Sequence, residues 1–320
     1  MTKPLLFTQM ALVTGLMAMS AGMASAQDFP NKPIRIVCAA AGGGADFVAR
    51  IIAQAISGPL GQPVIVENRP SRLTGEIVAK ATPDGYTLLL AGGTFMFAPL
   101  LGKMPYDPIQ DFSSITMLAR APNVIVVHPS VPAKSVKELI ALVKSRPGEL
   151  NYASGGTGSS LHLAGELFKA MAGVNITRIN YKGTGQAISD LVGGQVQMAF
   201  SSAATVAPHV KSGRLRALAV TSLQPSPLAP GLPTVTASGV PGYEVESIDY
   251  MLAPAKAPAA PIRRLNREIV RILSQTDLKE KFLNAGIEAA PSSPADLAAI
   301  MKSEIAKWGK VIKDAGIKAD

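Results

Sequence analysis

The chain has 320 residues, of which 48% are hydrophobic and 17% charged, values typical of a well-packed globular protein with room for two domains. This composition excludes an intrinsically disordered chain. The net charge is +9, but the basic residues are scattered and the chain has only one Trp and six Tyr, which argues against nucleic-acid binding.

The N-terminal segment has the pattern of a secretory signal peptide. A short region with Lys3 precedes an apolar stretch from about Leu5 to Met19, and the Ala-Ser-Ala at residues 24–26 fits a cleavage site. The apolar stretch is shorter than the roughly 20 residues of a transmembrane helix. We therefore expect residues 1–26 to be removed and the mature protein to work outside the cytoplasm. Cys38 is the only cysteine, so no disulfide forms within the chain.

Strand-like and helix-like runs alternate through the next part of the chain. The expected strands cover residues 34–39, 63–69 and 86–92, and the expected helices cover 47–56 and 74–81. This β-α-β-α-β order favours a mostly parallel sheet covered by helices.

The same alternation restarts near residue 123, as expected for a second lobe. Strands are predicted at 123–129, 150–154, 177–182, 196–202 and 214–222, and helices at 135–145, 159–171 and 185–194. A loop rich in Pro, Gly and Ser follows at 224–244, then a strand near 250–255 and helices at 261–274 and 293–316. The last helix has apolar residues at helical spacing, which predicts that Trp308 lies in the core. We expect lobe 1 to comprise residues 27–125 and 246–320, and lobe 2 residues 126–245.

A glycine-rich loop, Gly42-Gly43-Gly44, joins the first predicted strand to the first predicted helix. Glycine allows close approach of a ligand, and the free amides and positive dipole end of a helix N-terminus attract an anion. The dinucleotide fingerprint is not met, because Phe47 stands where its third glycine would be. A tight turn in which Asp46 caps the helix is the alternative interpretation.

A second loop of the same kind spans residues 154–160 and adds serine and threonine hydroxyls. Two such loops, one in each lobe, suggest a ligand held between the lobes. A third loop of small residues, with Tyr181 and Gly183, also precedes a helix and is expected at the edge of the site. Neither glycine-rich loop contains an arginine, so we expect main-chain amides to hold the anion.

Catalytic and metal sites find less support in the sequence. Ser159 or Ser160 with His162 would suit a secreted serine hydrolase, but the Gly-x-Ser-x-Gly motif of such enzymes is absent. His128, His162 and His209 are isolated, and no spacing typical of metal ligands joins them. We expect neither a metal nor a cofactor.

Several segments resemble the solute receptors of tripartite tricarboxylate transporters, also called Bug receptors. The resemblance covers nearly the whole mature chain in register, and it includes GGGADFVARIIAQ, LGQPVIVENRP, TPDGYTLLLA, GSSLHLAGELFKAMAG and INYKGTGQAISDLVGGQVQMAF.

This resemblance implies a periplasmic binding protein of the two-lobed type II α/β fold, each lobe a mostly parallel sheet flanked by helices. It also implies that the lobes close on a small organic acid, that the partners are the membrane permease subunits of the transporter, and that the protein is not an enzyme. We expect a monomer. The family's two carboxylate-binding loops match residues 39–46 and 154–160 here. The full set of expected ligand-contacting residues is Ala39, Ala40, Ala41, Gly42, Gly43, Gly44, Ala45, Asp46, Ser154, Gly155, Gly156, Thr157, Gly158, Ser159, Ser160, His162, Tyr181, Gly183, Ser201, Ser202 and Asp249.

The chain departs from the family pattern at several of these positions. Residues 39–41 are alanines where the family usually has prolines, Ala45 replaces a common Thr, and a shorter segment at 71–77 replaces a glycine-rich one. Ser201 and Ser202 replace an Asp-Asn pair. Asp249 stands where an apolar or aromatic residue is usual. Either Asp249 is solvated or caps a turn, or its carboxylate faces the ligand and favours a zwitterionic or hydroxylated monoacid over a dicarboxylate.

Overall fold

The computed structural model describes residues 29–39, 41–42, 44–155, 159–181 and 184–317. The expected signal peptide lies outside this part of the chain. Ala40, Gly43, Gly156, Thr157, Gly158 and Gly183, all expected at the binding site, also lie outside the described residues.

The first lobe is built on three strands, β1 (Ile34–Cys38), β2 (Val64–Asn68) and β3 (Thr87–Gly92). β1 lies in the middle and pairs in parallel with both neighbours, as the β-α-β-α-β order predicted. The connecting helices are α2 (Gly44–Leu60) and α3 (Ser71–Ala79), and both were predicted. A further helix, α4 (Gly93–Leu101), was not predicted, because its sequence GTFMFAPLL is apolar on all sides and contains a proline.

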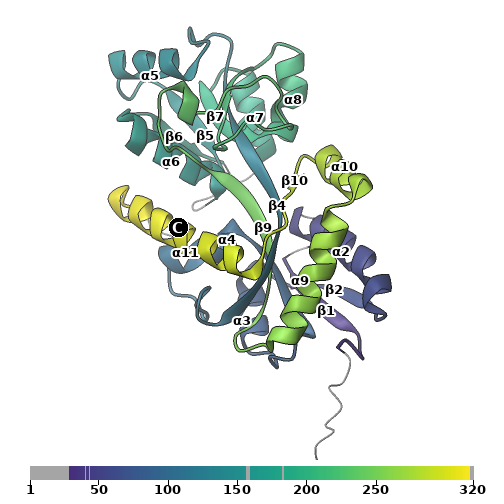
Figure 1. Ribbon diagram of the computed structural model, residues 1–320. Helices are drawn as coiled ribbons and strands as arrows, with labels where there is room; N and C mark the ends of the chain where they lie inside the picture. Colours follow the sequence, from purple (N-terminus) through teal and green to yellow (C-terminus); the bar gives the residue numbers. More distant parts are fainter. Residues whose placement is uncertain (1–28, 40, 43, 156–158, 182–183, 318–320) are drawn as a thin grey trace, which may run out of the picture.

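Two long strands connect the lobes and run side by side through the middle of the molecule (Figure 1). They are β4 (Phe112–Val127) and β9 (Glu246–Pro254), which pair antiparallel. The C-terminal part of β4 continues beyond β9 and pairs with strands of the second lobe. β4 begins well before residue 123, the predicted start of this strand. The sequence did not indicate the earlier part, because two irregularities in the pairing with β9 interrupt the alternation of its side chains.

The second lobe repeats the arrangement of the first. β5 (Asn151–Ser154) pairs in parallel with β6 (Thr177–Asn180) and β7 (Met198–Ser202), while β7 and β8 (Arg216–Val220) pair antiparallel with β4. The helices are α5 (Val136–Ser145), α6 (Ser160–Ala172), α7 (Thr184–Val192) and α8 (Ala203–Lys211). α8 was not predicted; it follows β7 directly and contains Pro208. A short 3-10 turn, Thr236–Ser238, lies in the predicted loop.

After β9 the chain returns to the first lobe. It forms α9 (Ala259–Leu273), α10 (Thr276–Asn284), the short strand β10 (Glu288–Ala289) that pairs with β4, and α11 (Pro294–Asp314). α11 lies beside the paired strands β4 and β9 and packs on α4, β4 and α6 (Figure 1). Trp308 of α11 is 1% exposed and packs against Phe97, which confirms its predicted place in the core.

Three apolar clusters hold these layers together. One packs α2 and α9 on the sheet of the first lobe, and another packs α7 and α8 on that of the second. The largest extends through both lobes, from Phe95 and Tyr250 to Phe168 and Phe200. The two-lobed α/β fold is therefore confirmed, while the lobe boundaries near residues 125 and 246 remain a prediction. Among the described residues, no helix combines the length and apolar character that a membrane span requires.

Candidate ligand-binding site

The first glycine-rich loop connects the end of β1 to the start of α2. Gly42 has a φ of +81°, a conformation that other residues rarely adopt, so a glycine is required there. Ala41, Gly42 and Gly44 are exposed, and a side chain at Gly42 or Gly44 would meet no atom within 4 Å. The described part of this loop is thus open to an approaching molecule.

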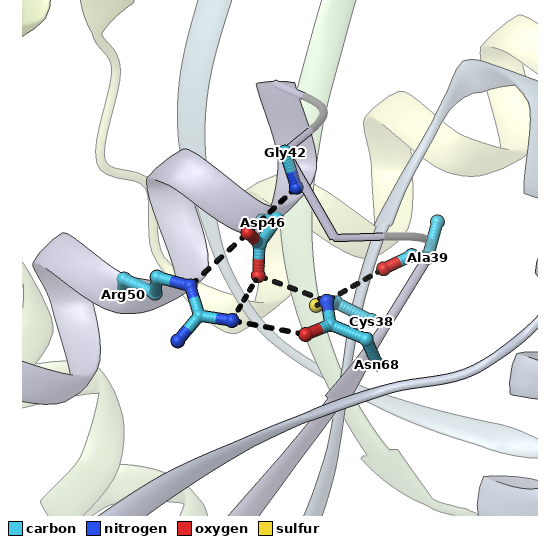
Figure 2. A network of polar contacts seen from close by, with 6 residues as sticks. All are labelled: Cys38, Ala39, Gly42, Asp46, Arg50 and Asn68. Atoms are coloured by element: carbon cyan, nitrogen blue, oxygen red, sulfur yellow. Dashed lines mark hydrogen bonds and ion pairs between the residues drawn. The ribbon is translucent and has the colours of Figure 1, made fainter.

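A polar network ties this loop to α2 and β2 (Figure 2). The Asp46 carboxylate accepts hydrogen bonds from the Gly42 amide at 2.9 Å, from Asn68 Nδ2 at 2.8 Å and from Arg50 Nε at 3.0 Å. Asn68 Nδ2 also donates to the Ala39 carbonyl at 2.8 Å, and Arg50 Nη2 donates to Asn68 Oδ1 at 3.0 Å. The two ends of the loop are therefore fixed by one carboxylate and one amide side chain.

Two groups in this network, Asp46 and Cys38, have shifted pKa values. The hydrogen bond from Arg50, followed by those from Gly42 and Asn68, lowers the pKa of Asp46 to about 2. Burial and the neighbouring Asp46 charge raise the pKa of the Cys38 thiol to about 11. Asp46, expected either to contact the ligand or to cap the helix, is 5% exposed and engaged with protein partners, including an amide that precedes α2.

Sequence reasoning missed Asn68 and Arg50. Asn68 ends β2 directly opposite Cys38, the last residue of β1. Because parallel neighbouring strands end at one edge of a sheet, the paired ends of β1 and β2 were the available signal. Arg50 lies one helical turn after Asp46, a spacing that commonly forms an ion pair.

The second glycine-rich loop connects β5 to α6. Ser159 is the N-cap of α6, and its hydroxyl accepts the His162 amide at 3.3 Å. A guanidinium from β6 braces the start of the loop: Arg178 Nε donates to Ser154 Oγ at 2.7 Å, and Arg178 Nη2 donates to the Gly155 carbonyl at 3.1 Å. Sequence reasoning missed Arg178 because it looked for cations within the loops, and Arg178 comes from the neighbouring parallel strand.

Ser160 links the second loop to the strands that connect the lobes. Ser160 lies in the first turn of α6, and its hydroxyl accepts a hydrogen bond from the Ser247 hydroxyl of β9 at 3.2 Å. His162 is 3% exposed, in the same turn. In this geometry the Ser159 hydroxyl serves as a helix cap for the His162 main chain.

The remaining predicted residues lie at strand ends of the second lobe. Tyr181 is 8% exposed and donates its hydroxyl proton to Asp190 of α7 at 2.9 Å. Ser202 is the N-cap of α8 and accepts the Thr205 amide. Ser201 is fully buried, and its hydroxyl has no hydrogen-bond partner among the described residues.

Asn123 of β4 is a further polar residue that sequence reasoning missed. It is 2% exposed and lies opposite Ser202, and its side-chain Nδ2 also has no partner in the part of the chain that the structure describes. Buried polar groups without partners are rare, and they gather here where β4 enters the second lobe.

Asp249 lies on β9, with Gly92 of β3 on one side and Ala119 of β4 on the other. Burial raises the pKa of its carboxyl to about 6. The side chain is half-buried, and it is neither fully solvated nor placed at a turn, because it belongs to the middle of a paired strand.

Two cavities lie elsewhere, and the larger of them is lined in part by α11. Their volumes are about 180 and 250 Å³, both are lined by Arg120, Glu244 and Glu246, and neither includes a residue of the two loops. Burial raises the pKa of Glu246 to about 7. Among the residues that the structure describes, no group of His, Cys, Asp and Glu could hold a metal ion.

Comparisons with known proteins agree with the fold. The family model of the "Tripartite tricarboxylate transporter family receptor" matches residues 48–317. BugT of Bordetella pertussis (strain Tohama I) is 34% identical over 321 residues, with 97% of this chain and 98% of BugT covered. Rpa4515 of R. palustris, solved with adipate, is 35% identical with a TM-score of 0.75, and the match covers 92% of this chain and 100% of that one. MatC (Rpa3494) of Rhodopseudomonas palustris, solved with bound malate, is 29% identical with a TM-score of 0.70, and the match covers 89% and 100% of the two chains. This chain belongs to the tripartite tricarboxylate transporter receptor family, a family of periplasmic solute-binding proteins.

Proposed function

We propose that this protein captures a small organic carboxylate between its two lobes and delivers it to the permease subunits of a tripartite tricarboxylate transporter. The observation that carries this proposal is the pair of glycine-rich loops, each at the N-terminus of a helix and each in a different lobe. Helix N-termini favour carboxylates, because their first amides lack partners within the helix and the dipole is positive there. The adipate and malate found with two relatives are of this chemical class.

Binding between lobes explains how a receptor signals that it is loaded. A ligand shifts the equilibrium between open and closed states only by its difference in affinity for the two. Contacts from residues 39–46 and from 154–160 supply that difference, because both loops reach the same molecule only when the lobes approach each other. The crossovers near residues 125 and 246 act as hinges, and the permease distinguishes the closed form from the open one.

Other parts of the proposal follow from the sequence and the family. The segment 1–26 is a cleaved signal peptide, the protein works in the periplasm as a monomer, and it carries out no catalysis. Ser201, Ser202 and Asn123 line the second-lobe side of the site. The Ser201 hydroxyl and the Asn123 amide support this, because both are buried and neither has a partner among the residues described.

A thermal-shift screen of small organic acids tests the proposal. A ligand at about 100 times its Kd stabilises the folded protein by roughly 2.7 kcal/mol, so a specific acid raises the melting temperature, and sodium chloride at equal ionic strength leaves it unchanged. A panel of mono- and dicarboxylates without any stabilising member contradicts the proposal.

A generic ester assay tests the serine hydrolase alternative on the same protein. We expect no turnover above that of heat-denatured protein. Turnover that disappears in His162→Ala, with the variant still folded, would support a hydrolase instead.

A further inference from the structure

Asp249 lies on β9, one of the two paired strands that connect the lobes. Side chains alternate along a strand, so Ser247, Asp249 and Met251 share one face. Met251 belongs to the apolar cluster formed by α2, and Ser247 contacts Ser160 at the N-terminus of α6. Asp249 stands between these two contacts, about 7 Å along the strand from Ser247 at roughly 3.3 Å per residue.

The pairing of β3 with β9 places the end of β3, in the first lobe, beside Asp249. Gly92, the residue opposite Asp249, ends β3 and is the N-cap of α4. A Cβ at Gly92 would lie 3.0 Å from Asp249 Oδ1, so this carboxylate lies against the bare backbone at the end of β3. β1 ends at Cys38, next to β3, and the first glycine-rich loop therefore leaves the sheet at this edge.

The carboxylate of Asp249 has no partner within the described part of the chain. No hydrogen bond or ion pair reaches it, and burial alone accounts for its raised pKa. The carboxylate of Asp46, by contrast, accepts three hydrogen bonds in the same lobe, and its pKa is lowered. A half-buried carboxylate without a donor is unfavourable, so the position suits an incoming group that donates hydrogen bonds or carries a positive charge.

We infer that Asp249 receives the ammonium group of a small zwitterionic acid whose carboxylate is held at the N-termini of α2 and α6. This inference rests on the proposed function and narrows its ligand class. Asp249 thus determines specificity: it repels the second carboxylate of a dicarboxylate and attracts an ammonium, with a hydroxyl as the weaker substitute. A carboxylate at the start of α6 would lie near Ser160, which contacts Ser247, and Asp249 is about 7 Å along β9 from Ser247. We therefore expect a ligand chain of about three to five carbons, on the ~3.3 Å spacing of strand residues.

Two series of acids that differ in one end group test this inference by calorimetric titration. One series is 3-aminopropanoate, 4-aminobutanoate and 5-aminopentanoate, and the other is succinate, glutarate and adipate. We expect the tightest amino acid to bind the native protein at least tenfold more tightly than the dicarboxylate of equal length. In Asp249→Asn this preference should disappear or reverse, since the amide has the same shape without the charge. Asp277→Asn, which removes an exposed carboxylate on α10, is the matched control and should keep the native preference.

Each outcome of this titration bears on one proposal. Tighter binding of a dicarboxylate by the native protein, or an unchanged preference in Asp249→Asn, overturns the role of Asp249 and leaves the proposed function intact. Failure of both series to bind overturns the zwitterion inference, and the wider acid screen then decides the proposed function separately. Melting curves of both variants, measured first, establish that they are folded.

Discussion

The two glycine-rich loops share a position in their lobes but are held in opposite ways. In the first loop a buried carboxylate, Asp46, accepts the Gly42 amide, so one donor of the loop is already used. In the second loop a guanidinium, Arg178, donates to the Gly155 carbonyl and to Ser154. The brace of the first loop is therefore an anion, and that of the second is a cation.

This difference predicts unequal roles for the loops. An anionic ligand near the first loop meets Asp46, whose charge is only partly offset by the exposed Arg50. Near the second loop it meets the positive charge of Arg178, which also occupies the Gly155 carbonyl with a hydrogen bond. We expect the second loop to supply most of the carboxylate affinity and the first loop to complete the site on closure.

The largest effect is expected from a side chain in the second loop. In Gly155→Val the added carbon would lie 3.3 Å from Ser159 Oγ and would cover the backbone that the carboxylate approaches. If the ligand carboxylate loses two hydrogen bonds from amides of this loop, at about 1.5–3 kcal/mol each, binding weakens by at least about 100-fold. Titration with the acid identified by screening measures this. Gly58→Val, near the C-terminal end of α2 where an added Cβ would meet no atom within 4 Å, is the control and should leave the affinity unchanged. A loss of less than about threefold in Gly155→Val would remove the second loop from the site.

Replacement of the guanidinium should have the next largest effect. Arg178→Met removes both described hydrogen bonds and the positive charge, and we expect affinity to fall about tenfold, equivalent to about 1.4 kcal/mol. Arg178→Lys keeps the charge but not the two-pronged contact, and it should recover part of the loss. Equal affinities for the native protein and Arg178→Met would contradict the proposed dominance of the second loop.

A smaller effect is expected from the brace of the first loop. Asn68→Ala removes the hydrogen bonds to Ala39 and Asp46, so the loop loses its fixed shape while its amides remain. We expect a three- to tenfold loss of affinity and about 1–3 kcal/mol of stability, on the usual scale for hydrogen-bonded groups that lose a partner. Arg72→Ala is the control, because Arg72 is exposed and makes no hydrogen bond or ion pair with the described residues. A larger loss than that of Arg178→Met would reverse the ranking of the two loops.

The smallest effect on binding is expected from Arg50, whose side chain is largely exposed. Arg50→Ala should change affinity by less than about threefold, as is usual for exposed ion pairs. The effect of Arg50→Ala should instead appear in the stability of the protein at acid pH. The pKa of Asp46 is lowered from 3.8 to about 2, so its contribution to stability is complete above pH 4 and is lost as the pH falls toward 2.

Urea unfolding between pH 5 and pH 2.5 measures this effect. Removal of Arg50 returns the Asp46 pKa toward its ordinary value, so the native protein should be more stable than Arg50→Ala above pH 4, with the difference shrinking below. A difference that is constant with pH would show that Arg50 does not act through Asp46.

The sequence predicted those parts of the fold that depend on local pattern. The amphipathic helices α2, α6 and α11 were found because their apolar residues recur at helical spacing, and both loops were found because glycines and serines stand between a strand and a helix. α4, α8 and α10 were missed; α4 is apolar on all sides, α8 contains a proline, and α10 has only nine residues.

The partners of the loops could not be predicted in the same way. Asn68 and Arg178 approach their loops from neighbouring strands, so their roles depend on strand order and register, which a single sequence does not reveal. The hydrogen bonding of the two carboxylates, Asp46 and Asp249, could not be predicted for the same reason. Asp46 and Asp249 look alike in the sequence, but among the described residues Asp46 accepts three hydrogen bonds and Asp249 accepts none.

A distance between the lobes, measured with and without ligand, tests the central claim most directly. Spin labels on Gln54→Cys in α2 and Lys211→Cys in α8, both exposed, report the separation of the lobes by pulsed electron resonance. The native Cys38 is buried and its thiol pKa is raised, so it does not take the label. We predict that saturating ligand moves the distance distribution to shorter values in the native background and fails to do so in Gly155→Val. An unchanged distribution in a protein that the same ligand stabilises against heat would contradict the account of a carboxylate held between two closing lobes.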